Sequence, residues 1–300
     1  MIINSQTLDA AFKGFKTLFN DAFEGAPSHL DKVAMRAPSN SREEIYGWIG
    51  QFPGLREWVG ERYVKNLSAH DYAIPNKKFE STVAVIRDDI SDDRIGIYKP
   101  MFQEMGRAAK VHPDTVVFGL LKKAFETKCY DGQYFFDADH VGYVEEGASL
   151  AEVSVSNMQA GTDPAWFLFD TSRAVKPIIW QEREAYEFQT QNSDGSDQVF
   201  MKDEYRYGVR ARCNAGFGLW QLGFGSKADL TAANYEAARA AMVKFTGDQG
   251  QMLGIVPTLM VVPSVLEAKA RKLIMADKLE NGEANIWKDS VELVVTPWLG

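Results

Sequence analysis

A run of alternating residues around position 209 restricts the fold of this chain more than any other feature. Its apolar members are Tyr205, Tyr207, Val209, Ala211 and Cys213, and the residues between them include Arg206, Arg210 and Arg212. A period of two predicts a strand that is buried on one face only. The arginine face has two readings: a solvated sheet surface, or a surface that binds carboxylates within the subunit or across a subunit boundary.

Helical and extended patterns occupy separate blocks of the sequence. Strand signals run from 165 to 224, with apolar stretches at 166–169 and 178–180. In the last quarter, an Ala-rich helix over 231–245 precedes a buried strand at 258–262. A helix that begins with a capping box of Ser264 and Glu267 and a strand at 291–295 follow, which predicts a parallel crossover. The chain is therefore expected to be α+β.

The N-terminal segment carries an aromatic stripe at helical spacing. Its phenylalanines are Phe12, Phe15, Phe19 and Phe23. Spacings of three and four place them on one face of a helix that Thr7 can cap and Gly25 can end. The stripe can dock on the chain's own core, or it can belong to an arm that is buried on a neighbouring subunit. The loose segment 26–41, rich in Pro, Ser and Asn, favours the arm.

A hairpin and a broken helix are predicted next. Two strands at 63–72 and 79–87 flank a turn at 75–78, which includes Lys77 and Lys78. Both faces of the second strand are partly apolar, so the hairpin must lie on another surface. A helical stripe then covers 95–128, interrupted by Pro113.

Signatures of catalysis and of cofactor binding are weak. Residues 223–228 fit a loose G-x-G-x-x-A pattern, but the acidic partner is misplaced, so this is interpreted as a glycine-rich turn. Asp137, Asp139 and His140 have no further ligand cluster and are interpreted as a polar loop. The two cysteines match no metal or redox spacing and are expected to be reduced core residues. No catalytic, cofactor or metal site is predicted.

Charge and hydropathy exclude some functional classes. The formal net charge of −8 argues against broad wrapping of nucleic acid, which needs clustered Lys and Arg. No secretory signal is found, and no stretch approaches the ~18 consecutive apolar residues of a membrane span.

Four motifs resemble one family in the same order. The run 170–177, D-T-S-R-A-V-K-P, resembles a D-T-S-R-x-x-K-P stretch of the Mu-like phage major head subunit. The runs 214–221, 257–263 and 294–299 resemble that family as well. Each motif is modest alone, but the similarity extends over nearly the whole chain.

The resemblance implies a coat fold of the Hong Kong 97 phage type. The expected parts are an N-terminal arm at 1–40, an extended loop at 41–94 with a hairpin at about 63–87, a spine helix of the peripheral domain at 95–128, and the remaining peripheral strands with an axial domain at 129–300, helix-rich at about 228–290. The boundaries within the last part are expected to be discontinuous.

The implied function is that of a major capsid protein, not an enzyme. Subunits would form pentamers and hexamers of an icosahedral head around double-stranded DNA, which they would bind without sequence specificity. Assembly would take place in the host cytoplasm. A separate scaffold or protease, a portal and decoration proteins are implied partners. The assembly-interface candidates are Phe12, Phe15, Phe19, Phe23, Lys77, Lys78, Arg206, Arg210 and Arg212. The rivals are a cellular nanocompartment shell of the same fold and a nucleotide-dependent soluble enzyme.

Overall fold

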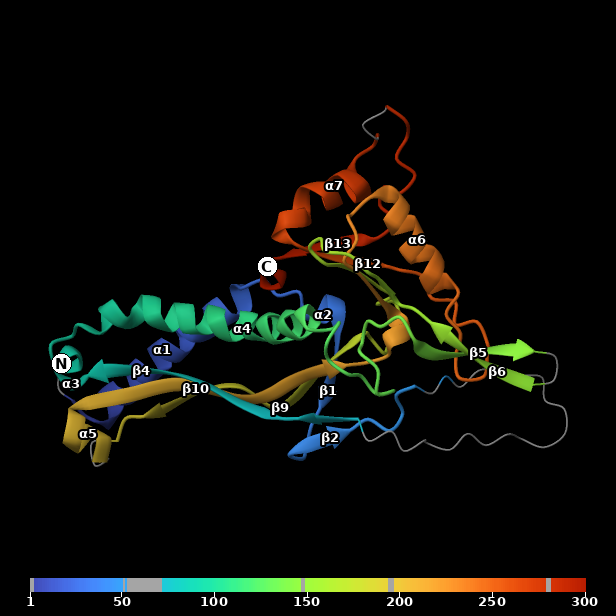
Figure 1. Cartoon of the computed structure of the whole chain (residues 1–300). Helices are drawn as coiled ribbons and strands as arrows, with labels where there is room; N and C mark the ends of the chain where they lie inside the picture. The colour runs from blue at the N-terminus through green and yellow to red at the C-terminus, as the bar shows by residue number, and fades with distance from the viewer. Residues whose placement is uncertain (1–2, 51, 53–71, 147–148, 194–196, 279–281) are drawn as a thin grey trace.

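The computed structural model describes residues 3–50, 52, 72–146, 149–193, 197–278 and 282–300. Figure 1 shows an elongated slab in which two long helices cover a sheet, a lobe that rises from one end of the slab, and a hairpin that projects beyond the lobe. The N-terminus lies at the far end of the slab, and the C-terminus lies where slab and lobe meet. The α+β expectation is confirmed.

The sheet of the slab has four strands in the order β1-β9-β10-β4. Their bounds are Ala34–Pro38 for β1, Ile178–Gln191 for β9, Glu204–Phe217 for β10 and Lys77–Ile86 for β4. β1 runs parallel to β9, whereas β9–β10 and β10–β4 are antiparallel pairs. The predicted alternation is confirmed, since Tyr205, Tyr207, Val209, Ala211 and Cys213 are all buried.

Two helices, α1 (Ser5–Gly25) and α4 (Lys99–Lys122), cover this sheet. In α1 the N-cap is Asn4, and Thr7 completes a capping box with it. The helices touch at Gly106 of α4, where an added Cβ would lie 2.2 Å from the Phe19 carbonyl oxygen. The predicted break at Pro113 was wrong, because α4 continues through it. Pro113 is itself buried, so tertiary packing outweighs the lost backbone hydrogen bond.

The predicted turn at 75–78 was also wrong. The chain stays extended from β3 (Ala73–Pro75) into β4, with a single residue, Asn76, between them. β3 pairs with β2 (Glu43–Ile45), and β4 pairs with β10. A long partner strand distant in sequence has outcompeted the local turn. The first predicted strand of the hairpin, 63–72, falls outside the described residues except for its last position.

The lobe is built on a second sheet with the order β13-β12-β8-β11-β7. Its strands are β7 Met158–Gln159, β8 Trp166–Phe169, β11 Gly223–Ser226, β12 Leu259–Pro263 and β13 Glu292–Thr296. The predicted parallel crossover is confirmed, as β12 pairs in parallel with β13 and α7 (Glu267–Met275) connects them. The capping box was wrong: Ser264 begins a 3-10 turn, and α7 has no side-chain cap. Helix α6 (Ala232–Val243) also belongs to the lobe.

Short elements complete the described chain. They are α2 Leu30–Val33, α3 Arg87–Ser91, α5 Asp197–Lys202, the projecting strands β5 His140–Glu146 and β6 Ser149–Val155, and the 3-10 turns η1 Ile95–Tyr98, η2 Trp220–Leu222, η3 Ser264–Leu266 and η4 Pro297–Leu299. The buried apolar residues form two clusters. One lies between α1, α4 and the part of the slab sheet far from the lobe, and the other fills the lobe and its junction with the slab. None of the described helices is long and apolar enough to cross a membrane.

Candidate functional site

The aromatic stripe of α1 faces the chain's own core. Phe15 and Phe19 are buried, with exposed fractions of 3% and 2%. Phe15 stacks on Phe102 of α4 at 4.1 Å between ring centroids and meets Tyr207 of β10 edge-on. Phe12 and Phe23 are partly buried against the same cluster. In this conformation the helix takes the docked alternative that the sequence left open.

The arginine row lies on the open face of the β9–β10–β4 sheet and is paired with carboxylates of the same subunit. Arg206 Nη2 lies 2.8 Å from Glu204 Oε1. Arg210 Nη2 and Arg212 Nη1 share the carboxylate of Glu184 in β9, at 3.2 Å from Oε2 and 3.1 Å from Oε1. The predicted pairing with carboxylates is confirmed within the subunit. Arg210 is 47% exposed, so its pair is a surface pair worth about 0–1 kcal/mol.

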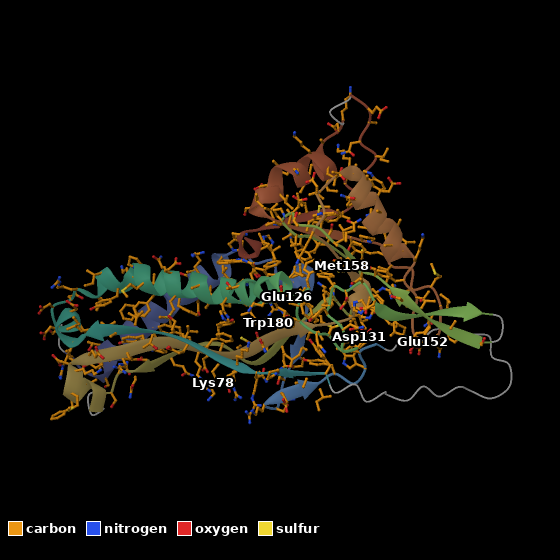
Figure 2. The ribbon with its side chains drawn as sticks, in the orientation of Figure 1. Lys78, Glu126, Asp131, Glu152, Met158 and Trp180 are labelled. Carbon is orange, nitrogen blue, oxygen red and sulfur yellow. The ribbon has the colours of Figure 1, made fainter. Side chains whose placement is uncertain are left out.

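Lys77 and Lys78 begin β4 and are both exposed. Lys78 lies directly opposite Arg212 in the register with β10. Figure 2 shows Lys78 on the side of the sheet away from α4. This surface therefore mixes the basic residues of β4 and β10 with the acidic residues of β9.

The glycine-rich segment is a strand and not a phosphate-binding loop. Residues 223–226 form β11, paired antiparallel with β8. An added Cβ on Gly225 would lie 2.7 Å from the Phe136 ring. These glycines therefore serve close packing under aromatic rings, which removes the basis for the nucleotide reading.

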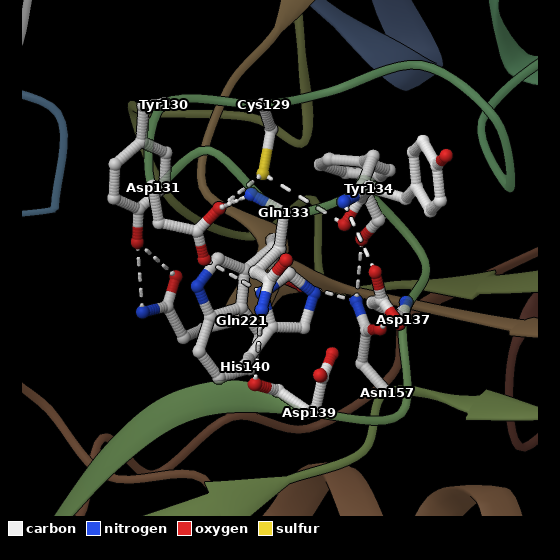
Figure 3. Close-up of polar contacts among 12 residues, drawn as sticks. Cys129, Tyr130, Asp131, Gln133, Tyr134, Asp137, Asp139, His140, Asn157 and Gln221 are labelled. Carbon is white, nitrogen blue, oxygen red and sulfur yellow. Dashed lines mark hydrogen bonds and ion pairs between the residues drawn. The ribbon is translucent and has the colours of Figure 1, made fainter.

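A polar cluster that sequence reasoning missed lies between α4 and β5. The Cys129 thiol donates to Asp131 Oδ1 at 3.1 Å, and His140 Nδ1 lies 2.7 Å from Asp131 Oδ2. His140 is fully buried and stacks on Trp220, with 4.1 Å between ring centroids. Figure 3 shows these side chains gathered around the Asp131 carboxylate. Asp137 and Asp139 are not members of the cluster and precede β5 in a loop, as expected. The polar-loop interpretation was wrong for His140, which is buried at the start of β5.

The electrostatics of this cluster follow from burial and hydrogen bonding. Burial raises the pKa of the Cys129 thiol well above its usual value, so the thiol stays protonated in the absence of a cation. For Asp131, burial acts to raise the pKa, but the hydrogen bonds from His140, Cys129 and the Gln133 N–H prevail and lower it. Asp131 is therefore a carboxylate that accepts from three donors.

A second missed feature is an exposed apolar tip. Phe200 and Met201 of α5 are 86% and 75% exposed at the far end of the slab. Single exposed apolar residues are ordinary, but two adjacent ones at an extremity mark a contact candidate. The apolar run V-F-M at 199–201, between a turn and a strand start, was the available sequence signal.

Comparison with known proteins places this architecture. A family model described as Mu-like prophage major head subunit gpT matches residues 8–299. The chain is 41% identical over 305 residues to the major capsid protein of Escherichia phage Mu, and the match covers 100% of both chains.

Solved structures agree. The bacteriophage JBD30 procapsid subunit matches with a TM-score of 0.86 and 46% identity, over 99% of this chain and 100% of that chain. The JBD30 capsid decorated with minor capsid protein trimers matches with a TM-score of 0.73 and 35% identity, over 92% of both chains. The fold is therefore the expected Hong Kong 97-type phage capsid fold, and the relatives are structural proteins rather than enzymes. The chain belongs to the Mu-like prophage major head subunit gpT family of phage capsid proteins.

Proposed function

We propose that this major capsid protein forms pentamers and hexamers that close into an icosahedral phage head around double-stranded DNA. The observation that carries the proposal is the full-length identity of 41% to a major capsid protein, with both chains covered completely. The net charge of −8 suits a wall that must hold DNA without adhering to it. The implied contact with DNA is therefore not sequence-specific.

The parts of the subunit would take the following roles. Residues 1–40 are the arm, 41–94 the extended loop and 95–128 the spine helix of the peripheral domain. Residues 129–300 supply the other peripheral strands and the axial domain, whose helix-rich part is about 228–290. A discontinuous division of this last part is supported by the two sheets, because β9 and β10 lie in the slab sheet, whereas β8, β11, β12 and β13 lie in the lobe sheet. The packing of α1 on α4 supports an arm that begins as part of the slab.

Assembly would rest on contacts at the extremities of the subunit. Phe200 and Met201 lie at the tip of the slab, and Ile286 (77% exposed) and Val265 (71% exposed) belong to the lobe. Burying such side chains on a neighbour contributes about 25 cal/mol per Å² of apolar surface. Lys77, Lys78 and the arginine row are further interface candidates on the open face of the slab sheet.

Other head proteins would complete the particle. A separate scaffold or protease, a portal and decoration proteins are the expected partners, and assembly would occur in the host cytoplasm. The JBD30 capsid that this chain resembles is decorated with minor capsid protein trimers.

Particle size and content test the proposal. Expressed with its scaffold, the protein should elute as capsomers or megadalton particles, and negative-stain microscopy should show closed shells. Heads from infected cells should contain nuclease-protected DNA. A small soluble oligomer under every condition would contradict shell formation, and an enzyme cargo in place of DNA would indicate a nanocompartment.

A further inference from the structure

The cluster of Cys129, Asp131 and His140 brings three different metal-ligand types together. One sulfur, one carboxylate oxygen and one ring nitrogen lie within 4.8 Å of one another. In a tetrahedral zinc site, bonds of about 2.0–2.3 Å place the donors roughly 3.3–3.5 Å apart. The observed contacts of 3.1 Å from sulfur to oxygen and 2.7 Å from oxygen to nitrogen are slightly shorter. The third separation, from sulfur to ring nitrogen, is at most 4.8 Å, so the donors would reach tetrahedral spacing by movements between a few tenths of an ångström and about 1.3 Å.

Complete burial of the histidine is the second observation. His140 is 0% exposed, and among the described residues its Nε2 has no hydrogen-bond partner. The nitrogen that faces Asp131 is Nδ1, so an ion inside the cluster would bind Nδ1, while Nε2, on the other side of the ring, would carry the ring proton. The imidazole is held against Trp220, so the ring is fixed in orientation.

We propose that Cys129, Asp131 and His140 bind a divalent transition-metal ion, best matched by zinc. The thiolate and the carboxylate neutralise the two charges of the ion, so the buried site is electroneutral while the imidazole stays neutral. Sulfur and nitrogen donors select zinc over magnesium and calcium, which prefer oxygen.

Binding is an exchange of protons for the ion. Zinc displaces the thiol proton of Cys129 to solvent and binds Nδ1 of His140, whose proton moves to Nε2 so that the ring stays neutral. Of the three proposed ligands, Asp131 lines a pocket of about 200 Å³ together with Tyr143 and Asp248. An ion would therefore enter past the Asp131 carboxylate, and a water from the pocket would supply the fourth ligand.

The ion would fasten a junction of the fold. Cys129 follows α4, His140 begins β5, and Trp220 belongs to η2, which precedes β11. A metal here ties the end of the long helix to the projecting β5–β6 hairpin and to the lobe.

Metal content of the purified full-length protein tests this directly, whether or not it assembles. After zinc loading and gel filtration, the wild type should retain about one zinc ion per chain, the stoichiometry of a single site. Cobalt substitution should give a thiolate-to-cobalt charge-transfer band, and EDTA should lower the melting temperature. Cys129→Ser keeps a hydrogen-bond donor for Asp131 but loses the thiolate, so it should weaken zinc binding at least ~10-fold.

Cys213→Ser is the matched control, since Cys213 is also buried but lies outside the cluster, near Tyr186. It should retain zinc and the cobalt band. Two results would overturn the proposal: wild-type protein without bound zinc after loading, or equal zinc retention in both serine variants. If Cys129→Ser does not fold, the cobalt spectrum of the wild type decides alone, because absence of the thiolate band rejects Cys129 as a ligand.

Discussion

Replacing the buried phenylalanines of α1 by alanine tests whether this helix stabilises its own subunit or serves only assembly. Phe15→Ala and Phe19→Ala remove rings that lie in the core between α1, α4 and β10. Loss of a buried Phe costs about 3–5 kcal/mol. Phe15 also lines a surface groove on α1, so its site can partly refill, and we expect a loss of about 3 kcal/mol. Phe19 does not line that groove, and we expect its replacement to cost about 4–5 kcal/mol.

The assay is urea unfolding of the unassembled subunit, followed by tryptophan fluorescence. Linear extrapolation gives the free energy of unfolding of each variant in the absence of urea. Phe200→Ser is the control because its ring is 86% exposed in the lone subunit. Its free energy of unfolding should stay within about 0.5 kcal/mol of wild type, while its particle yield should fall.

The docking of α1 on its own subunit would be refuted by the reverse pattern. If Phe15→Ala and Phe19→Ala have the free energy of unfolding of the wild type but fail to form particles, the stripe acts as an arm on a neighbouring subunit. If Phe200→Ser forms particles normally, the α5 tip is not an assembly contact.

Three further predictions test particular contacts. Glu184→Gln removes the carboxylate that Arg210 and Arg212 share. Because these ion pairs are partly exposed, the free energy of unfolding measured in urea should fall by less than about 1 kcal/mol. A fall of more than about 3 kcal/mol would mean that the arginines form buried ion pairs. Burial lowers the pKa of His112, so between about pH 6.5 and its folded pKa the unfolded chain binds more protons. Stability should therefore fall as pH decreases through that window, and an unchanged slope in His112→Gln would contradict this. Gly225→Ala should cost about 1–3 kcal/mol because its Cβ would lie 2.7 Å from the Phe136 ring, whereas Gly119→Ala in α4, with open space around it, should raise the melting temperature.

Patterns that depend on one element were predictable from sequence. The alternation at Tyr205–Cys213 identified the buried and the arginine faces of β10, and the aromatic stripe identified α1. The predicted cap Thr7 was wrong, because the N-cap is Asn4. The strand–helix–strand order after 257 predicted the parallel pair β12–β13. Each of these signals is a local periodicity that burial of one face imposes.

Features that depend on distant partners were not predictable. Pro113 ends a helix by local rules, yet the packing of α4 on the sheet carries the helix through it. The predicted turn at 75–78 does not form, because β4 pairs instead with β10, which lies more than a hundred positions later in the sequence. The capping box failed because the chain tightens into a 3-10 turn at Ser264 before α7 begins.

The polar cluster shows the same limit for sites. Cys129, Asp131 and His140 follow no metal-binding spacing, and His140 was assigned to a polar loop with its neighbours Asp137 and Asp139. The stacking of His140 on Trp220, eighty positions later, buries it. Only the tertiary fold separates this buried histidine from the half-buried Asp137 and the exposed Asp139.

Electron cryomicroscopy of particles from cells that express the chain with its scaffold tests whether this subunit builds a phage head. We expect closed icosahedral shells in which pentamers and hexamers of this chain form the wall, with α1 packed on α4 in the immature particle. Discrete small oligomers without closed shells, at protein concentrations where the scaffold is bound, would contradict it.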